Sequence, residues 1–155
     1  MREAEPPRDE RTIPLTTLLP QAGAIPPPVP SPLTRPYWDG CNRGELLYQH
    51  CGVCGRATHT PAYICSNCTS PALTWEQSSG LGTIYSWTTV WRPQVPAFTV
   101  PYVAIVVDMD EGWQVLSNLI GCDVGDVEIG MRVQVEFHPI DGGFQLPYFR
   151  PVDRG

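Results

Sequence analysis

Four cysteines fall into two pairs of equal spacing, and no other pattern in the chain has so clear a chemical meaning. Cys51 and Cys54 form the first pair, Cys65 and Cys68 form the second, and ten residues separate the pairs. Two residues between cysteines allow a tight turn to direct both thiolates at one ion, and two such turns supply tetrahedral S4 coordination. The pattern predicts one structural zinc ion. Iron in the same cage and unligated thiols are the alternatives.

A closed site of four thiolates leaves no open position for water or substrate, so we expect it to stabilise a loop-rich segment and not to catalyse a reaction. Gly55 follows the first pair, where a tight turn needs a positive φ. Thr69 follows the second pair at the same place, so the second turn is expected to be less favourable. His50 and His59 flank the cysteines and are expected to be exposed or hydrogen-bonded side chains, since four thiolates need no further ligand.

Other residues capable of chemistry lack partners at a useful spacing. Cys41 and Cys122 are isolated and are expected to be small buried or half-buried residues. No glycine-rich phosphate loop, Gly-x-Ser-x-Gly elbow or His-Glu-x-x-His motif is present. His138 and Asp141 follow each other closely, but a catalytic role for them has little support. The sequence therefore favours a protein that is not an enzyme by itself.

The charge of the chain argues against a partner that is held through many phosphate contacts. The formal net charge is −6, and all ten cationic side chains are arginines. Nonspecific affinity for nucleic acid comes largely from Lys and Arg that neutralise phosphates. A module that binds single-stranded nucleic acid through stacked aromatic side chains is therefore a minor alternative.

The beginning of the chain and its apolar runs bear on location. The first ten residues are acidic and contain prolines, whereas a secretory signal needs a basic start and an apolar stretch. No apolar run approaches the roughly 18 residues that span a bilayer. Cysteine pairs in such a chain favour metal over disulfides. We expect a cytoplasmic protein that does not bind membranes.

Composition and hydropathy divide the chain into five parts. They are a proline-rich tail that we expect to be disordered, a helix with its lead-in, the metal-binding ribbon, a β domain and a C-terminal tail: residues 1–31, 32–48, 49–75, 76–151 and 152–155. The alternative for the first part is a docking segment that orders through its leucine-rich patch. In the second part, four apolar residues share one side of a short helix: Leu33, Tyr37, Trp38 and Cys41.

Five strands are predicted in the β domain, because their residues are rich in β-branched and aromatic types. They are residues 81–91, 102–109, 113–120, 132–138 and 144–149. The second is almost wholly apolar, which is typical of a strand buried on both faces. Five short strands with a break between the third and fourth favour a closed OB-fold barrel over a sandwich.

Several short stretches occur in a characteristic order. The helix aromatics Tyr37 and Trp38 and the two cysteine pairs are accompanied by residues 43–47, 80–86, 129–133 and 146–151. In this order the chain resembles the acyl-CoA-associated proteins that join a rubredoxin-like zinc ribbon to an OB-fold, long described as a domain of unknown function. The likeness runs from Leu33 to Pro151 and leaves out the tail before Ser31.

The resemblance implies a mainly β fold in which an N-terminal helix, a rubredoxin-like zinc ribbon and a five-stranded OB-fold barrel follow one another. It implies a noncatalytic accessory subunit of an enzyme that acts on CoA thioesters. The implied partner is a thiolase-like, lipid-transfer-type enzyme, such as a retro-aldolase of sterol side-chain degradation, in a hetero-tetramer around an enzyme dimer. The alternative partner is a hot-dog-fold enoyl-CoA hydratase.

The resemblance also implies that the OB-fold helps to form a channel for CoA or acyl-CoA. Such a channel needs apolar walls and one or two cations. Five residues are candidates for the channel or for partner contact: Tyr37, Trp38, Trp91, Arg92 and Phe98. The last three belong to the segment from Trp91 to Phe98 that joins the first two predicted strands, a loop that OB-folds use for binding. The alternatives are that the loop aromatics cap the barrel and that the helix aromatics pack against it.

Overall fold

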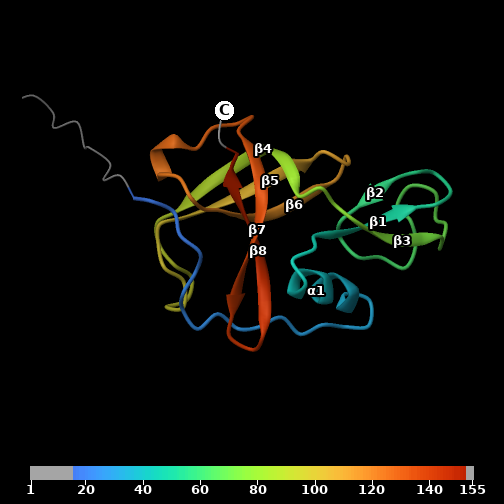
Figure 1. Cartoon of the computed structure of the whole chain (residues 1–155), viewed down its shortest axis with the longest axis horizontal. Coiled ribbons are helices and arrows are strands. Elements are labelled where there is room, and N and C mark those ends of the chain that lie inside the picture. The colour runs from blue at the N-terminus through green and yellow to red at the C-terminus, as the bar shows by residue number, and fades with distance from the viewer. Residues whose placement is uncertain (1–15, 153–155) are drawn as a thin grey trace, which may run out of the picture.

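The computed structural model of the chain describes residues 16–152; the parts of the predicted tails at 1–15 and 153–155 lie outside the described residues. Figure 1 shows two units: a three-stranded sheet that carries the cysteines, and a closed five-stranded barrel. Helix α1 (Arg35–Asn42) lies at their junction and contacts both. The expected mainly β fold, with helix, ribbon and OB-like barrel in this order, is confirmed.

The ribbon is a small antiparallel sheet with the strand order β2-β1-β3. The central strand is β1 (Leu47–Cys51), and its neighbours are β2 (Ala57–Thr58) and β3 (Leu73–Gln77). On β1, Gln49 lies opposite Thr58 on one side and Trp75 on the other. For this region the sequence predicted only an extended lead-in before the first cysteine pair. It did not predict β2, because a strand this short forms only where a partner strand is already in place.

The barrel closes in the order β4-β5-β6-β8-β7. Its strands are β4 (Leu81–Val90), β5 (Tyr102–Met109), β6 (Gln114–Leu119), β7 (Arg132–Ile140) and β8 (Phe144–Pro151). All five lie where the sequence predicted them. The predicted break before β7 contains a short 3-10 helix, η1 (Val124–Asp126). Antiparallel pairing of β4 with β7 and a single parallel pair between β6 and β8 complete the barrel.

The barrel core is built by alternate residues of each strand. On β5, Val103, Ile105 and Val107 are fully buried, whereas Ala104 and Val106 between them are only half-buried. The expectation that this strand is buried on both faces is therefore wrong. Because the barrel is closed, only one face of each strand points inward, and the outer face of β5 carries small apolar residues that are partly covered.

Helix α1 packs against both units through its aromatic side. Tyr37 and Cys41 are buried, and Trp38 is half-buried with its ring edge-on to Phe144 of β8, at a centroid distance of 6.1 Å. The helix ends before Gly44, which has φ 77° and so reverses the chain without strain. The helix aromatics thus pack within the protein, as in the alternative stated for them. Within residues 16–152, no helix is long and apolar enough to span a membrane.

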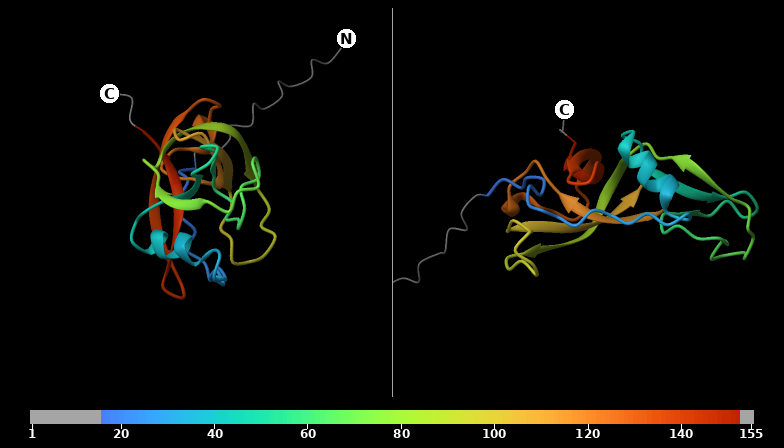
Figure 2. Two further views of the ribbon diagram at one scale, coloured as in Figure 1. Left: turned by 90° about the vertical axis from the view of Figure 1, so that its right-hand side faces the viewer. Right: turned by 90° about the horizontal axis from the view of Figure 1, so that it is seen from below.

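Residues 16–30, which we call the N-terminal segment, are packed on the barrel and not disordered as predicted. Leu18 is 2% exposed, its N–H donates to the carbonyl of Cys122 (2.8 Å), and its carbonyl accepts from the N–H of Gly121 (2.8 Å). Figure 2 shows the segment running along the barrel toward α1. Its prolines exclude a helix, but an extended chain can bond to another strand and bury one large side chain. Leu18 of the leucine-rich patch therefore docks on the chain's own barrel, whereas its neighbour Leu19 is exposed.

An aromatic stack joins the ribbon to the barrel. Trp113, just before β6, stacks on Tyr48 of β1 (centroid distance 5.4 Å) and on His59 (4.9 Å). The ring of Tyr37 meets His59 edge-on at 5.0 Å. Residues of both units and of α1 thus belong to one continuous core.

Candidate functional site

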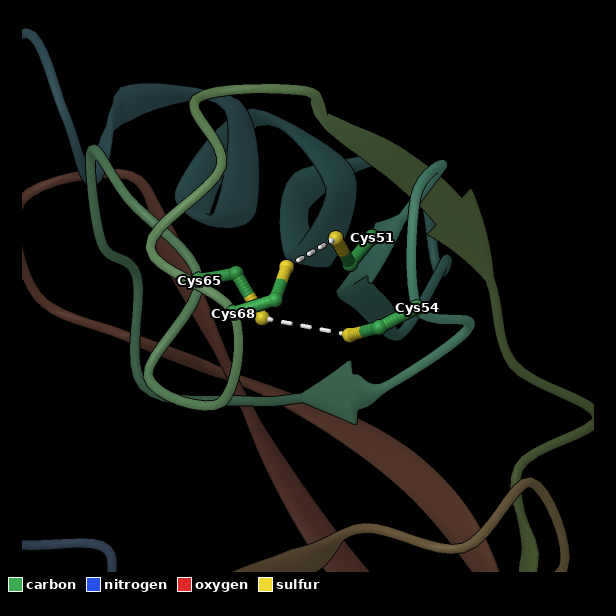
Figure 3. A group of neighbouring side chains, drawn as sticks. All are labelled: Cys51, Cys54, Cys65 and Cys68. Carbon is green, nitrogen blue, oxygen red and sulfur yellow. Dashed lines mark hydrogen bonds between the residues drawn. The ribbon is translucent and has the colours of Figure 1, made fainter.

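The four paired cysteines converge at one point of the ribbon. The first pair lies at the end of β1 and in the turn that follows it, and the second pair lies in the loop before β3. Figure 3 shows the four side chains directed toward a common centre. All four sulfur atoms lie within 4.8 Å of one another, and the Cys51–Cys68 and Cys54–Cys65 pairs are each 3.6 Å apart.

These separations fit a tetrahedral metal site. Four sulfurs at about 2.3 Å from a zinc ion stand about 3.8 Å from one another in an ideal tetrahedron. The closest pairs, at 3.6 Å, are near that value, so little movement is needed to hold an ion. All four ligands come from this chain, and such a set leaves no position for a substrate. The arrangement can therefore stabilise the ribbon but offers no reaction centre.

The two cysteine turns have the same backbone bonding. In the first, the N–H of Gly55 donates to the carbonyl of Cys51 (2.9 Å); in the second, the N–H of Thr69 donates to the carbonyl of Cys65 (2.9 Å). The φ angles of Gly55 and Thr69 are 73° and 59°. The expected difference between the turns is confirmed, because threonine holds a left-handed conformation that glycine adopts without strain.

Groups around the cysteines favour the thiolate at the first pair. The Asn67 side chain and the Arg56 backbone N–H lower the pKa of Cys54 to about 6, and backbone N–H groups also lower the pKa of Cys51. The N–H of Ser70 lowers the pKa of Cys68, but burial and the neighbouring sulfurs outweigh it and raise this pKa to about 12. Thiols this close therefore cannot all ionise without a cation, which again fits a metal site.

Gln49 fixes the loop between the two cysteine pairs. Its buried side chain accepts from the N–H of Ala62 (2.8 Å) and donates to the carbonyl of the same residue (3.1 Å). The amide thus takes the place of a neighbouring strand. Sequence reasoning missed this residue, because a glutamine on a strand gives no sign that its partner lies thirteen residues further on.

The flanking histidines stand apart from the metal-binding atoms. The Nδ1 atom of His50 lies 3.5 Å from a carboxylate oxygen of Glu76. His59 lies in the aromatic stack, where burial lowers its pKa to about 4 although a hydrogen bond to the Leu47 backbone raises it. His59 is therefore neutral at pH 7. The isolated Cys41 is buried and Cys122 is half-buried, as predicted.

An apolar groove of about 320 Å³ lies on the other side of α1. Three of the five candidate residues line it together: Tyr37 and Trp38 of the helix, and Phe98 of the β4–β5 loop, residues 91–101. Trp91 and Arg92 lie at the start of the same loop, outside the groove lining, and both are exposed. The structure thus brings together residues that are about sixty positions apart in the sequence.

The groove exists because β6 and β8 diverge. The two strands pair only at Leu119 and Phe149, and beyond that point the groove lies between them. Leu116 on β6 contributes to one wall and is 74% exposed. The Asn118 amide and the hydroxyl of Tyr148 supply polar atoms, and no described residue of the lining carries a charge at pH 7. Only an apolar residue at an outward position of β6 could have indicated this site in the sequence.

Comparison with known proteins places the two units in described domain families. Residues 38–74 match the family model described as the rubredoxin-like zinc ribbon domain of ChsH2, and residues 75–138 match its C-terminal OB-fold domain. A DUF35 domain-containing scaffold protein of Methanothermobacter thermautotrophicus is 30% identical over 100 residues, which are 63% of this chain and 75% of that protein.

One relative is considerably longer than the matched region. A probable enoyl-CoA hydratase alpha subunit of Thermomonospora curvata is 32% identical over 116 residues, which are 75% of this chain but 36% of that protein. The chain thus spans about a third of the length of the curated hydratase subunits that it matches.

Among solved structures, a chain of the Ltp2-ChsH2(DUF35) aldolase is similar, with a TM-score of 0.75 and 30% identity over 81% of this chain and 98% of that one. Fold, domain matches and sequence identity agree. The chain belongs to the ChsH2-type DUF35 family, whose members join a rubredoxin-like zinc ribbon to a C-terminal OB-fold.

Proposed function

We propose that the protein is a noncatalytic accessory subunit of a thiolase-like, lipid-transfer-type enzyme that acts on acyl-CoA thioesters. The observation that carries the proposal is the agreement with a chain of the Ltp2-ChsH2(DUF35) aldolase, which extends over 98% of that chain at a TM-score of 0.75. The name of the Methanothermobacter relative, a scaffold protein, supports the same kind of role. Retro-aldol cleavage of a sterol side chain is the reaction that we propose for the complex, in a hetero-tetramer around an enzyme dimer.

The metal centre has a supporting part in this function. We propose that Cys51, Cys54, Cys65 and Cys68 hold one zinc ion, which fits the sulfur separations of 3.6 Å in the two closest pairs. When bound, the ion supplies cross-linking of the ribbon and no reaction. The ribbon then presents a fixed surface to the partner enzyme.

The apolar groove is the proposed contribution to the CoA channel. Pantetheine is a neutral, flexible chain with two amide groups, and it needs apolar walls with a few hydrogen-bonding atoms. The described lining has this character: Tyr37, Trp38 and Phe98 supply aromatic walls, and Asn118 and Tyr148 supply polar atoms. Because the lining carries no charge, the phosphates of CoA must be bound elsewhere in the complex, either by the partner or by a cation such as Arg92.

Trp91 is the residue we propose for direct contact with the partner. It begins the β4–β5 loop, and 53% of its surface is exposed although it is a large aromatic side chain. Exposed tryptophan and arginine are typical of the centres of protein interfaces. Together with its neighbour Arg92, it offers the partner one aromatic and one cationic anchor beside the groove.

Co-expression with the candidate enzyme tests the proposal. The purified chain should turn over no acyl-CoA, whereas the partner should be more soluble and more active when both are expressed together. Trp91→Ala should weaken the complex by about 2 kcal/mol, or roughly thirtyfold in Kd. Val29→Ala, which removes an exposed side chain of the N-terminal segment, is the matched control. A partner that is fully stable and active alone would contradict the proposal.

A second candidate function is the same accessory role beside a hot-dog-fold enoyl-CoA hydratase. The similarity to the Thermomonospora hydratase alpha subunit favours it, although that similarity covers 36% of the relative. Capture of partners on the tagged chain, followed by mass spectrometry, separates the two: a thiolase-like enzyme supports the first function and a hot-dog protein supports the second.

A further inference from the structure

The N-terminal segment contributes to the groove although it precedes both regions that match the family models, residues 38–74 and 75–138. Gln21 and Ile25 of this segment belong to the groove lining. The segment is fixed at both ends: Thr17 pairs with Asp123 beyond β6, and Pro27 lies close to Gly142 in the β7–β8 turn. The segment therefore forms a fixed wall of the groove, and this wall comes from residues that precede the two matched domains.

Gln21 connects this wall to the two opposite sides of the groove. Its side chain, in a residue only 7% exposed, donates from Nε2 to the carbonyl of Thr99 (3.0 Å) and accepts at Oε1 from the N–H of Thr99 (2.8 Å). Its own backbone N–H donates to the hydroxyl of Tyr148 on β8 (3.2 Å). One residue thus bonds to the β4–β5 loop and to β8 at once.

The bond to Thr99 determines where Phe98 lies. Phe98 is the neighbour of Thr99 in the β4–β5 loop, its ring lines the groove, and it packs against Tyr102 at a centroid distance of 5.8 Å. Within the β4–β5 loop, the N–H of Phe98 donates to the carbonyl of Val95 (3.2 Å) and closes one turn. The Gln21 amide adds two bonds from outside and so orders a loop that has little regular structure of its own.

The backbones of the segment and the loop also meet closely at Gly23. A Cβ atom at this position would lie 2.0 Å from the carbonyl oxygen of Ala97. Any side chain at Gly23 must therefore push the segment and the loop apart. The segment and the β4–β5 loop are thus held together by hydrogen bonds at Gln21 and by close backbone packing two residues later, at Gly23.

We propose that Gln21 is a positioning residue of the groove: it holds Phe98 in place through Thr99 and thereby keeps the groove narrow. An apolar groove of about 320 Å³ without charged lining residues favours a slender, neutral chain over a bulky or charged one. This inference rests on the proposed function only where it names that chain as the pantetheine arm of CoA. The positioning itself depends on contacts within this protein alone.

The test compares two disruptive variants with a control in the full-length chain. Gln21→Ala removes the two side-chain bonds, and Gly23→Ala separates the same surfaces by steric contact. Gly125→Ala is the control, because an added Cβ there meets nothing within 4 Å. Amide hydrogen exchange at Thr99, followed by NMR, reports on the loop, and titration with free pantetheine, followed at the side-chain amide of Asn118, reports on the groove.

We expect both disruptive variants to raise the exchange rate at Thr99 roughly tenfold and to weaken pantetheine binding several-fold, whereas Gly125→Ala changes neither. Unchanged exchange in Gln21→Ala would overturn the inference, and so would faster exchange with unchanged pantetheine affinity. If the wild-type chain binds no pantetheine at all, the CoA part of the proposed function fails, and the exchange rates still decide the role of Gln21.

Discussion

The ribbon and the barrel differ in the kind of side chain that gathers at their centres. In the barrel, Val103, Ile105 and Phe149 are fully buried and pack in a continuous apolar core. In the ribbon, large apolar side chains such as Tyr63 and Ile64 are exposed, and the side chains that converge are cysteines. The barrel can therefore fold through the hydrophobic effect, while we expect the loops of the ribbon to depend on a metal ion.

This difference indicates which of the two units responds to metal supply and to pH. A structural zinc site contributes about 10–16 kcal/mol in small metal-binding peptides at pH 7, which is comparable to the net stability of a whole domain, about 5–15 kcal/mol. Metal supply and acidification should therefore act on the ribbon first. The stack of Tyr48, His59 and Trp113 joins the two units, so a disordered ribbon also exposes one end of the barrel core.

The largest effect is expected from loss of a metal ligand. Cys54→Ser removes one of four thiolates, so the zinc ion should be lost and the ribbon should unfold, while the barrel strands persist. Zinc content by atomic absorption and the NMR spectrum of the ribbon residues measure both outcomes. Partner binding should weaken without loss of a chemical step.

Cys122→Ser is the matched control for this experiment. Cys122 is half-buried beside η1, and burial raises the pKa of its thiol to about 11. The control should keep its zinc and its ribbon. A Cys54→Ser protein that keeps a folded ribbon without metal would show that the ribbon has a sufficient core of its own.

The second effect concerns the barrel alone. Ile105→Ala leaves a cavity at a fully buried position of β5 and should lower the free energy of unfolding by about 2–5 kcal/mol. Urea denaturation measures this change, and zinc content should stay the same until the barrel unfolds. Leu116→Ala, at an exposed position of β6, should change stability by less than about 0.5 kcal/mol. Loss of zinc from folded Ile105→Ala would show that the units are coupled more strongly than their separate means of stabilisation indicate.

Sequence alone was sufficient for the barrel and for the grouping of the four cysteines. The strands of the barrel alternate apolar and polar residues or are rich in β-branched types, and the cysteine spacing depends only on local turn geometry. Residues such as Val133 and Cys65 are therefore recognisable by their immediate neighbours. Both kinds of prediction concern contacts that a short stretch of chain determines.

Sequence was insufficient wherever a residue depends on a distant partner. Leu18 is predicted to belong to a disordered tail, because its hydrogen-bonding partners, the backbone groups of Gly121 and Cys122, lie far along the chain. The buried side-chain amides of Gln21 and Gln49 each bond to the backbone of a loop that comes later in the chain, where a neighbouring strand would otherwise bond. The groove likewise depends on the divergence of β6 and β8, which no local pattern predicts.

A third effect tests the fixed loop of the ribbon. Gln49→Ala leaves the backbone N–H and carbonyl of Ala62 without their partner, so the ribbon should lose about 1–3 kcal/mol of stability. Competition with a zinc chelator should show weaker zinc binding by roughly tenfold or more. Gln134→Ala, at an exposed position of β7, is the control. Equal zinc affinity in both variants would mean that the metal alone orders this loop.

A smaller effect is expected at the connection between the units. Glu111 accepts from the hydroxyl of Ser78 (2.9 Å) and from the N–H of Ser79 (2.6 Å). Burial raises the pKa of Glu111, but these donors outweigh it and hold the pKa below the usual value of 4.5. A carboxyl with a lowered pKa in the folded state stabilises the protein above its unfolded pKa, and this stability is lost as the pH falls through the folded pKa.

Glu111→Gln should therefore cost about 1 kcal/mol at pH 7, a value that is modest because the carboxylate is partly exposed. The cost should shrink below pH 4.5, where the carboxyl of the unfolded chain takes up its proton, and should vanish below the lower pKa of the folded protein. Urea denaturation of both proteins across this pH range measures the difference. A cost that is the same at all pH values would assign it to packing and not to charge.

The smallest effect distinguishes the two cysteine turns, which differ in one residue at the same place. Thr69→Gly removes the steric cost of a left-handed threonine, about 1–2 kcal/mol. It also gives the unfolded chain more freedom and removes the hydrogen bond from the Thr69 hydroxyl to the carbonyl of Cys68, and both of these changes lower the stability. The net gain should be about 0.5 kcal/mol, seen as roughly twofold tighter zinc binding. Gly55→Thr introduces the same strain without the compensation, so it should weaken zinc binding by roughly tenfold. If both variants weaken binding equally, the two turns are not equivalent, and the second owes its stability to contacts of the Thr69 side chain.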